Sequence, residues 1–188
     1  MKKVILSFFA IVLILSACSA ATAAPQPPPP GEVITTFMTF VKNGEYEEAQ
    51  ALIYEGSPFA LDEIEEEYRG IFTNITYEHI SETIDGDQAH VVLSINSVDF
   101  SAVMEEVMNE AFLWAFDDLT IGELTDRVEA LMIEKMVSGS APTVTNEVTV
   151  TLGLHNNQWK IQADAYFADS VTGGMFSFAE YIGQWDED

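Results

Sequence analysis

Residues 74–100 read NITYEHISETIDGDQAHVVLSINSVDF. Two runs rich in β-branched residues, 74–84 and 88–100, flank Asp85-Gly86-Asp87, which is a typical hairpin turn. A two-residue Asp85-Gly86 turn has the better turn chemistry. A three-residue loop instead places the alternating apolar residues of both strands on one face: Ile75, Tyr77, His79, Val91, Leu93 and Ile95. Because a one-residue slip would turn every side chain to the opposite face, we follow the hydrophobic pattern and predict the three-residue loop.

A second hairpin is expected near the C-terminus, with strands over 143–154 and 158–166 joined at His155-Asn156-Asn157. Apolar residues at helical spacing predict helices at residues 32–42, 46–54, 61–72, 101–116 and 120–139. Thr120 and Glu123 form a capping box at the start of the last of these helices. Because helices and strands occur in separate runs, the sequence predicts an α+β fold. The apolar segment after residue 174 is expected to dock on the domain.

The N-terminal segment has the pattern of a secretory signal. Lys2 and Lys3 precede an apolar run over residues 4–17, which as a helix is about 20 Å long and so shorter than a hydrocarbon core of about 30 Å. The run ends in Leu15-Ser16-Ala17-Cys18, which resembles the signal box of bacterial lipoproteins. This resemblance implies that Cys18, the one cysteine of the chain, receives a diacylglycerol and becomes the mature N-terminus. Ordinary secretion with cleavage near residues 21–23 and an uncleaved anchor are the alternatives.

The chain is accordingly divided into three parts. Residues 1–17 are the predicted lipoprotein signal peptide, 18–31 a Pro-rich tether, and 32–188 a single domain. Prolines 25 and 27–30 favour a stiff polyproline II rod, and the fully extended tether reaches about 40 Å. Anchor and tether together predict a location on the extracytoplasmic face of a bacterial cell membrane, attached through lipidated Cys18.

The charge of the chain excludes one class of partner. Seven Lys and Arg residues stand against 31 Asp and Glu residues, and the formal net charge is −24. Nucleic-acid binding requires cationic side chains for the phosphates, so no nucleic-acid partner is predicted. The same acidity opposes contact with anionic lipid, and we interpret most of it as a solvated acidic surface.

Residues 37–49, FMTFVKNGEYEEA, followed by a helix and a hairpin, resemble the nuclear-transport-factor-2-like (cystatin-like) superfamily, and in particular its bacterial lipoprotein branch. Residues 143–150, TVTNEVTV, and Trp159-Lys160-Ile161 resemble the same branch. The resemblance implies a curved antiparallel sheet of about four strands wrapped on the N-terminal helices, with a conical pocket between them. The helices predicted over 101–137 are then a two-helix insertion between the hairpins.

Recognisable catalytic motifs are absent from the sequence. It contains no Ser-His-Asp order, Gly-rich phosphate loop, zinc spacing or calcium loop, so no cofactor and no metal site is predicted. Some members of the resembled superfamily are isomerases or dehydratases that use Asp, His or Tyr in the pocket. By that resemblance Tyr77, His79 and Asp99 are the catalytic candidates. The alternative is that Tyr77 and His79 are ordinary strand residues and that Asp99 precedes a helix.

Two pairs of methionines suggest a binding surface on the inserted helices. Met104 and Met108 lie four residues apart on one helix, and Met132 and Met136 do so on the next. Together with Trp114 they could form an apolar groove or lid for a lipid, a peptide or a protein, because thioethers adapt to irregular surfaces. The alternative is that both helices pack these side chains into the core.

These observations lead to three hypotheses of function. The first is a membrane-anchored, non-catalytic lipoprotein that binds an apolar small molecule or an envelope protein. The second is a pocket enzyme of the isomerase, dehydratase or hydrolase type that uses Tyr77, His79 and Asp99. The third is a structural envelope protein whose sheet forms a homodimer, which would require an apolar outer sheet face.

Overall fold

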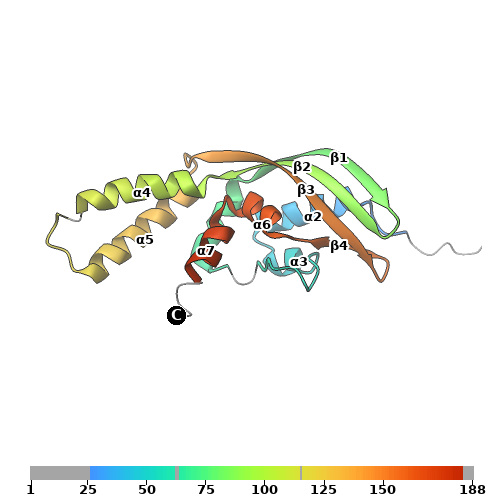
Figure 1. Ribbon diagram of the computed structural model, residues 1–188, viewed down its shortest axis with the longest axis horizontal. Helices are drawn as coiled ribbons and strands as arrows, with labels where there is room; N and C mark the ends of the chain where they lie inside the picture. The colour runs from blue at the N-terminus through green and yellow to red at the C-terminus, as the bar shows by residue number, and fades with distance from the viewer. Residues whose placement is uncertain (1–25, 62–63, 115, 184–188) are drawn as a thin grey trace, which may run out of the picture.

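Four antiparallel strands form one curved sheet in the order β1-β2-β3-β4 (Figure 1). The computed structural model describes residues 26–61, 64–114 and 116–183, with side chains described as far as residue 179. The strands are β1 (Thr76–Asp85), β2 (Gln88–Val98), β3 (Thr143–His155) and β4 (Gln158–Gln162). Because β2 pairs with β3 along its whole length, the two predicted hairpins share one layer. The predicted α+β class and four-stranded antiparallel sheet are confirmed.

A bulge in β1 reconciles the two conflicting signals of the first hairpin. At the loop, Asp85 pairs with Gln88, so the turn has two residues and the predicted three-residue loop is wrong. The pairing shifts by one residue between His79 and Ser81. Beyond this bulge His79 lies opposite Leu93, on the face that the hydrophobic pattern predicted. The extra residue lets the turn adopt its preferred length while the apolar face stays inward.

The N-terminal helices are α2 (Pro30–Asn43) and the short α3 (Tyr46–Gln50). Helix α2 has a proline in its first turn and ends at Gly44, whose φ of 78° is unstrained for glycine. Helix α3 is shorter than predicted because the following segment runs beside β4, where Ile53 and Ile161 form an isolated parallel bridge. The third predicted helix is replaced by a 3₁₀ helix, η1 (Glu66–Asn74).

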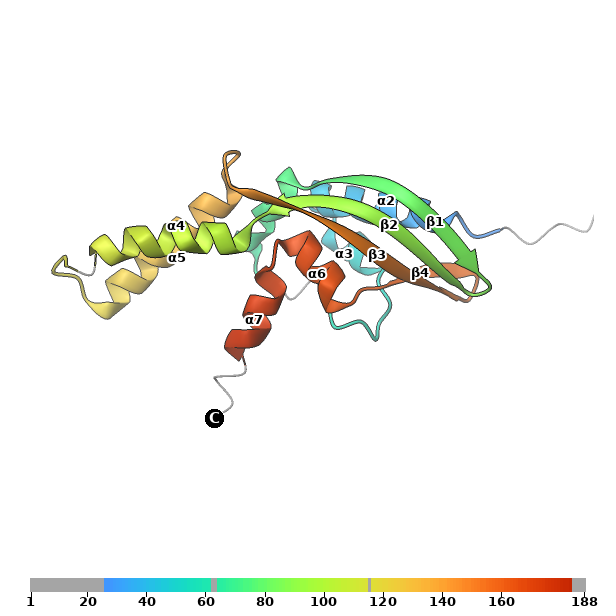
Figure 2. The same cartoon turned by 45° about the horizontal axis from the view of Figure 1, so that its top comes forward.

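The insertion between the hairpins is a pair of helices, α4 (Phe100–Trp114) and α5 (Ile121–Val137). They pack on each other, and α5 also contacts η1. The predicted capping box is present, because the Thr120 side chain accepts from the Glu123 backbone and the Glu123 carboxylate accepts from the Thr120 N–H. Figures 1 and 2 show this helical hairpin extending beyond the end of the sheet.

The C-terminal part of the described chain forms helices α6 (Ala165–Thr172) and α7 (Met175–Gly183). The predicted strand over 158–166 is therefore too long, because the Asp164 side chain caps α6 by accepting from the N–H of Phe167 at 2.8 Å. Met175, Phe176 and Phe178 pack against the core, so the predicted docking of this segment is confirmed for these residues.

The inner face of the sheet is covered by α2 and α6 (Figure 2). Phe37 of α2 and Phe167 of α6 are fully buried, with ring centroids 5.7 Å apart. They belong to a continuous apolar cluster that includes Leu93 and Ile95. Side chains thus fill the space between helix and sheet in which the resemblance implied a conical pocket. The outer face of the sheet is polar, with side chains such as Glu78, Ser81, Thr83, His90, Ser94, Asn96, Thr145, Glu147, Thr149 and Thr151.

The join between α6 and α7 tolerates only glycine. Gly173 has a φ of 69°, and a Cβ built there would lie 1.6 Å from the carbonyl oxygen of Val98. We expect Gly173→Ala to cost about 4 kcal/mol or more and to lower Tm by on the order of 10 °C. Gly174→Ala is the matched control, because Gly174 also has a positive φ, of 94°, but no atom lies within 4 Å of its Cβ position. Thermal melts followed by circular dichroism check this, and equal melting temperatures for the two variants would contradict it.

Candidate functional site

The three catalytic candidates do not meet at one point. Tyr77 lies opposite Ile95, whereas Asp99 follows the end of β2, four residues or about 13 Å farther along that strand. His79 lies farther from Asp99 still. The Asp99 carboxylate accepts a hydrogen bond from the backbone N–H of Ala102 at 3.0 Å, which makes it the N-terminal cap of α4. The catalytic role of these residues stays a prediction, but Asp99 does not lie in one site with Tyr77 and His79.

His79 lies instead beside the start of α2. A Cβ built at Gly31 would come within 3.0 Å of the His79 ring and 2.6 Å of the Glu82 carboxylate. The backbone N–H of Gly31 donates to Glu82 at 2.7 Å. Because the first N–H groups of a helix have no partner within the helix, Glu82 satisfies one of them and complements the helix dipole. Sequence reasoning missed this contact, since the predicted three-residue loop puts Glu82 on the outer face, whereas the two-residue turn pairs it with Val91 on the inner face.

A hollow of about 560 Å³ lies between α3 and the β3–β4 turn. Tyr54 and His155 stack at its edge, with ring centroids 4.8 Å apart, and the ammonium group of Lys160 donates to the carbonyl of Ala51. Its remaining lining is mostly carboxylate and amide side chains: Glu47, Gln50, Glu55, Asn156 and Gln158. Its lining thus mixes apolar surface with many charged and amide groups, unlike the predominantly apolar lining that is typical of small-molecule sites.

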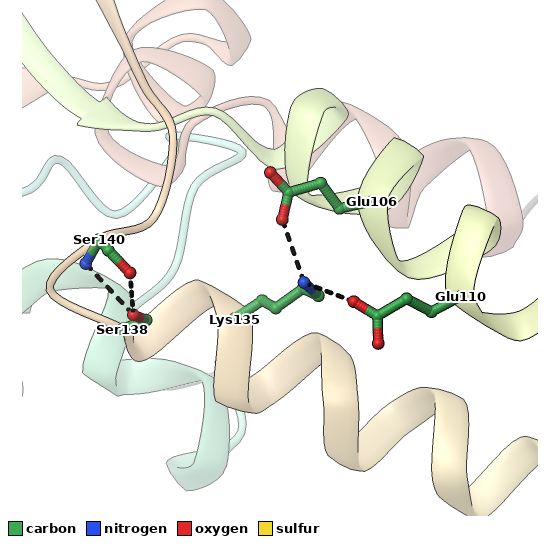
Figure 3. A network of polar contacts seen from close by, with 5 residues as sticks. All are labelled: Glu106, Glu110, Lys135, Ser138 and Ser140. Atoms are coloured by element: carbon green, nitrogen blue, oxygen red, sulfur yellow. Dashed lines mark hydrogen bonds and ion pairs between the residues drawn. The ribbon is translucent and has the colours of Figure 1, made fainter.

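The helical hairpin is held together by the two cations that it contains. The Lys135 ammonium lies 3.1 Å from Glu106 and 2.8 Å from Glu110 (Figure 3). The Arg127 guanidinium lies 4.0 Å from the centre of the Trp114 ring and 3.9 Å from Asp117. Both cations of α5 therefore bind residues of α4 or of the loop that follows it.

The hydrogen bonds from Lys135 to Glu110 and Glu106 raise the pKa of its ammonium group above the usual lysine value. Because the pKa is raised in the folded state, the stabilisation is complete below the ordinary lysine pKa of about 10.4. It is lost as the pH rises through the higher folded value. The cross-link is thus fully formed at neutral pH.

The five predicted binding residues do not share one surface. Met136 is buried in the core, and Met104 and Met132 are partly buried against it. Trp114 is partly buried beneath Arg127. Met108 is 57% exposed. The groove hypothesis stays a prediction, but the methionines divide between core packing and surface.

A different set of apolar residues is exposed, at the far end of the hairpin. Phe112, Phe116 and Ile121 are 65%, 77% and 86% exposed, and the first two rings touch edge to face with centroids 5.5 Å apart. We define the apolar tip as Met108, Phe112, Leu113, Phe116, Leu119 and Ile121. Ile121 continues the apolar spacing of the helix predicted over 120–139, but it is the first residue of α5 and is exposed. Exposed apolar residues that gather in one region are typical of interaction sites.

The described ranges contain neither a metal cluster nor a membrane span. No three His, Cys, Asp or Glu side chains within them are grouped as a metal ion would need. None of the helices in these ranges is both long and apolar enough to cross a bilayer. The predicted lipidation site, Cys18, lies outside the described residues.

Comparison with known proteins yields one similarity of shape. No protein-family model matches the chain, and no curated protein matches it in sequence. A crystal structure of a candidate lipoprotein (ycdA) from Bacillus subtilis has 17% sequence identity to this chain, with a TM-score of 0.46. The similarity covers 90% of this chain and 54% of that one, so the chain spans about half the length of the protein it matches.

Removing the Lys135 cross-link is expected to loosen the hairpin locally. In Lys135→Gln both ion pairs to α4 are lost, so backbone amides of α5 should exchange with deuterium a few-fold faster than in the unmodified chain. Hydrogen–deuterium exchange measured by mass spectrometry checks this. Lys42→Gln, at the exposed last turn of α2, is the control and should leave α5 unchanged. Equal protection of α5 in both variants would show that the cross-link is dispensable.

Proposed function

We propose that this chain is a lipid-anchored, extracytoplasmic, non-catalytic lipoprotein that binds a protein partner through the apolar tip of its α4–α5 hairpin. The observation that carries this proposal is the exposure of Phe112, Phe116 and Ile121 together on an element that projects from the body (Figure 1). Because these side chains are mostly exposed, they contribute little to the core. Aromatic and aliphatic groups of this kind form the central contacts of protein interfaces.

The tip is carried by a pair of helices that pack on each other. These two helices are joined by Lys135 at one level and by Arg127 at another, so the tip is presented by a supported structure. A pre-ordered surface loses less conformational entropy on binding than a flexible loop would. The Thr120–Glu123 capping box fixes the helix start at the tip itself.

The interior and the sheet offer less support for the other hypotheses. The core between α2 and the sheet is filled, and Asp99 caps a helix, so a pocket enzyme would lack both a cavity there and a converged set of groups. The outer sheet face is polar, which does not favour a homodimer through the sheet. In this proposal the scaffold is a nuclear-transport-factor-2-like domain, since the resemblance implies an antiparallel sheet wrapped on the N-terminal helix, here α2.

The start of α2 and the apolar tip lie at opposite ends of the described part of the molecule (Figure 1). The chain enters the domain at Pro30, beside the β1–β2 turn, where Gly31 contacts Glu82. From that turn, β2 and α4 follow one another toward the tip (Figures 1 and 2). Eleven strand residues and fifteen helical residues span roughly 60 Å end to end. A chain anchored through Cys18 would therefore hold the apolar tip away from its attachment point.

The anchor is tested by replacing its sulfur. In Cys18→Ala the thiol that accepts the lipid is removed, so the protein should move from the membrane fraction to the soluble extracytoplasmic fraction. Ser19→Ala is the matched control and should stay in the membrane fraction. Fractionation and mass spectrometry of the mature N-terminus check this. Equal retention of both variants in the membrane would contradict lipid anchoring.

The tip is tested by photo-crosslinking of the full chain in its native bacterial host. A photoreactive phenylalanine analogue at position 116 should give one defined protein adduct, identified as the same partner in repeated preparations. The analogue at Thr149, exposed on the outer sheet face, is the control and should not give that adduct. Phe112→Ser should abolish the adduct without changing the circular dichroism spectrum, because Phe112 is 65% exposed. Adducts of equal yield at both positions, or to lipid alone, would contradict protein binding at the tip.

A further inference from the structure

We infer that the partner of the apolar tip presents an apolar socket bordered by lysine or arginine side chains. This inference rests on the proposed function and adds the chemistry of the partner to it. The charged side chains around the tip indicate this chemistry. The net charge of the whole chain does not, because it says nothing of where the charges lie.

The helical hairpin contains a large excess of acidic residues. Residues 100–137 contain nine acidic and two basic residues, which gives a net charge of −7. Both basic residues are already bound within the hairpin, Lys135 by Glu106 and Glu110 and Arg127 by Trp114 and Asp117. Both cations of the hairpin are thus paired with carboxylates of the hairpin itself, although the Arg127 side chain is still 50% exposed.

Three of the carboxylates that take no part in these ion pairs lie within a few residues of the apolar tip in the sequence: Asp118, Glu123 and Asp126. Asp118 is exposed in the loop, and Asp126 is exposed on the second turn of α5. The carboxylate of Glu123 accepts hydrogen bonds from the Thr120 hydroxyl and backbone, and these lower its pKa. Glu123 is consequently ionised at and below neutral pH. The tip thus combines an apolar centre with a negative rim, and the complementary surface has an apolar centre and a positive rim.

Two other occupants fit the same charges less well. A second copy of the chain would bring two acidic rims together, and like charges facing each other across an interface are unfavourable. A bilayer containing anionic lipid would repel the rim before the phenylalanines could insert. A protein socket bordered by cations satisfies the apolar and the acidic parts of the tip together.

The test uses two synthetic amphipathic helical peptides with the same leucine face, one flanked by lysines and the other by glutamates. Binding of each labelled peptide to the full-length chain is followed by fluorescence anisotropy. We expect the lysine peptide to bind at low salt at least about 30-fold more tightly than the glutamate peptide. Its Kd should rise about 10-fold between about 50 mM and 500 mM NaCl, because the rim contribution is screened.

Three variants assign the effect to the tip. Asp118→Asn with Asp126→Asn should reduce the salt dependence, whereas Glu47→Gln with Glu48→Gln removes the same charge from α3 and should not. Phe116→Ser should weaken binding at both salt concentrations. Circular dichroism verifies that each variant is folded. Equal binding of the two peptides, or equal effects of the two double variants, would overturn the inference while leaving the crosslinking result at position 116 intact.

The competing occupants are measured in parallel. Sedimentation of the full chain at high salt would detect a dimer that Phe116→Ser removes, and flotation with vesicles of phosphatidylcholine and phosphatidylglycerol would detect insertion of the tip into lipid. Either result, obtained without a preference for the lysine peptide, would assign the tip to that occupant and overturn the inference. An absence of both, together with the lysine preference, supports it.

Discussion

The fold depends on the burial of two helices, α2 and α6, against the inner face of one antiparallel sheet. Phe37 and Phe167 meet beneath Leu93 and Ile95, and all four side chains are buried almost completely. Truncating an aromatic side chain in such a position costs about 3–5 kcal/mol, a large part of the stability of a domain of this size. Every other feature is arranged around this cluster. The cluster receives Met175, Phe176 and Phe178 from the C-terminal part, and Val103, Val107 and Met136 from the base of the α4–α5 hairpin.

Scarcity of positive charge is the second constraint. Five of the seven cationic residues lie in the described ranges, and four of them bind a ring, a carbonyl or a carboxylate nearby. Arg69, for example, donates to the carbonyl of Ile64 and lies over the ring of Tyr46. Internal use of these cations leaves the surface almost purely acidic. An acidic surface with one apolar tip can be selective. The acidic groups repel other acidic proteins, and the tip binds a partner whose surface is complementary to it.

The relation between the bulge in β1 and the start of α2 shows how local and distant effects combine. The residues around Gly86 favour a two-residue turn, whereas the apolar alternation of the two strands favours the register that a three-residue loop would give. One bulged residue satisfies both, so that His79 and Glu82 lie on the same face, where Glu82 accepts from the N–H of Gly31. A feature that resolves a conflict between two strands thereby positions a helix that lies more than fifty residues earlier in the chain.

The sequence by itself determined the α+β class, the four strands, the helical insertion and the capping box at Thr120, because each of these depends on the spacing of apolar or capping residues along a short segment. It did not determine where α3 and β4 end. The Ile53–Ile161 bridge, which joins segments far apart in the chain, limits α3, and the N-cap of α6 at Asp164 is a local signal that the alternating strand pattern concealed. The candidate site was decided only by the tertiary structure. Met136 and Ile121 both belong to the apolar stripe of one helix, yet one is buried and the other is 86% exposed. The difference arises because the body of the domain covers only the C-terminal part of α5, and the extent of that cover is a property of packing.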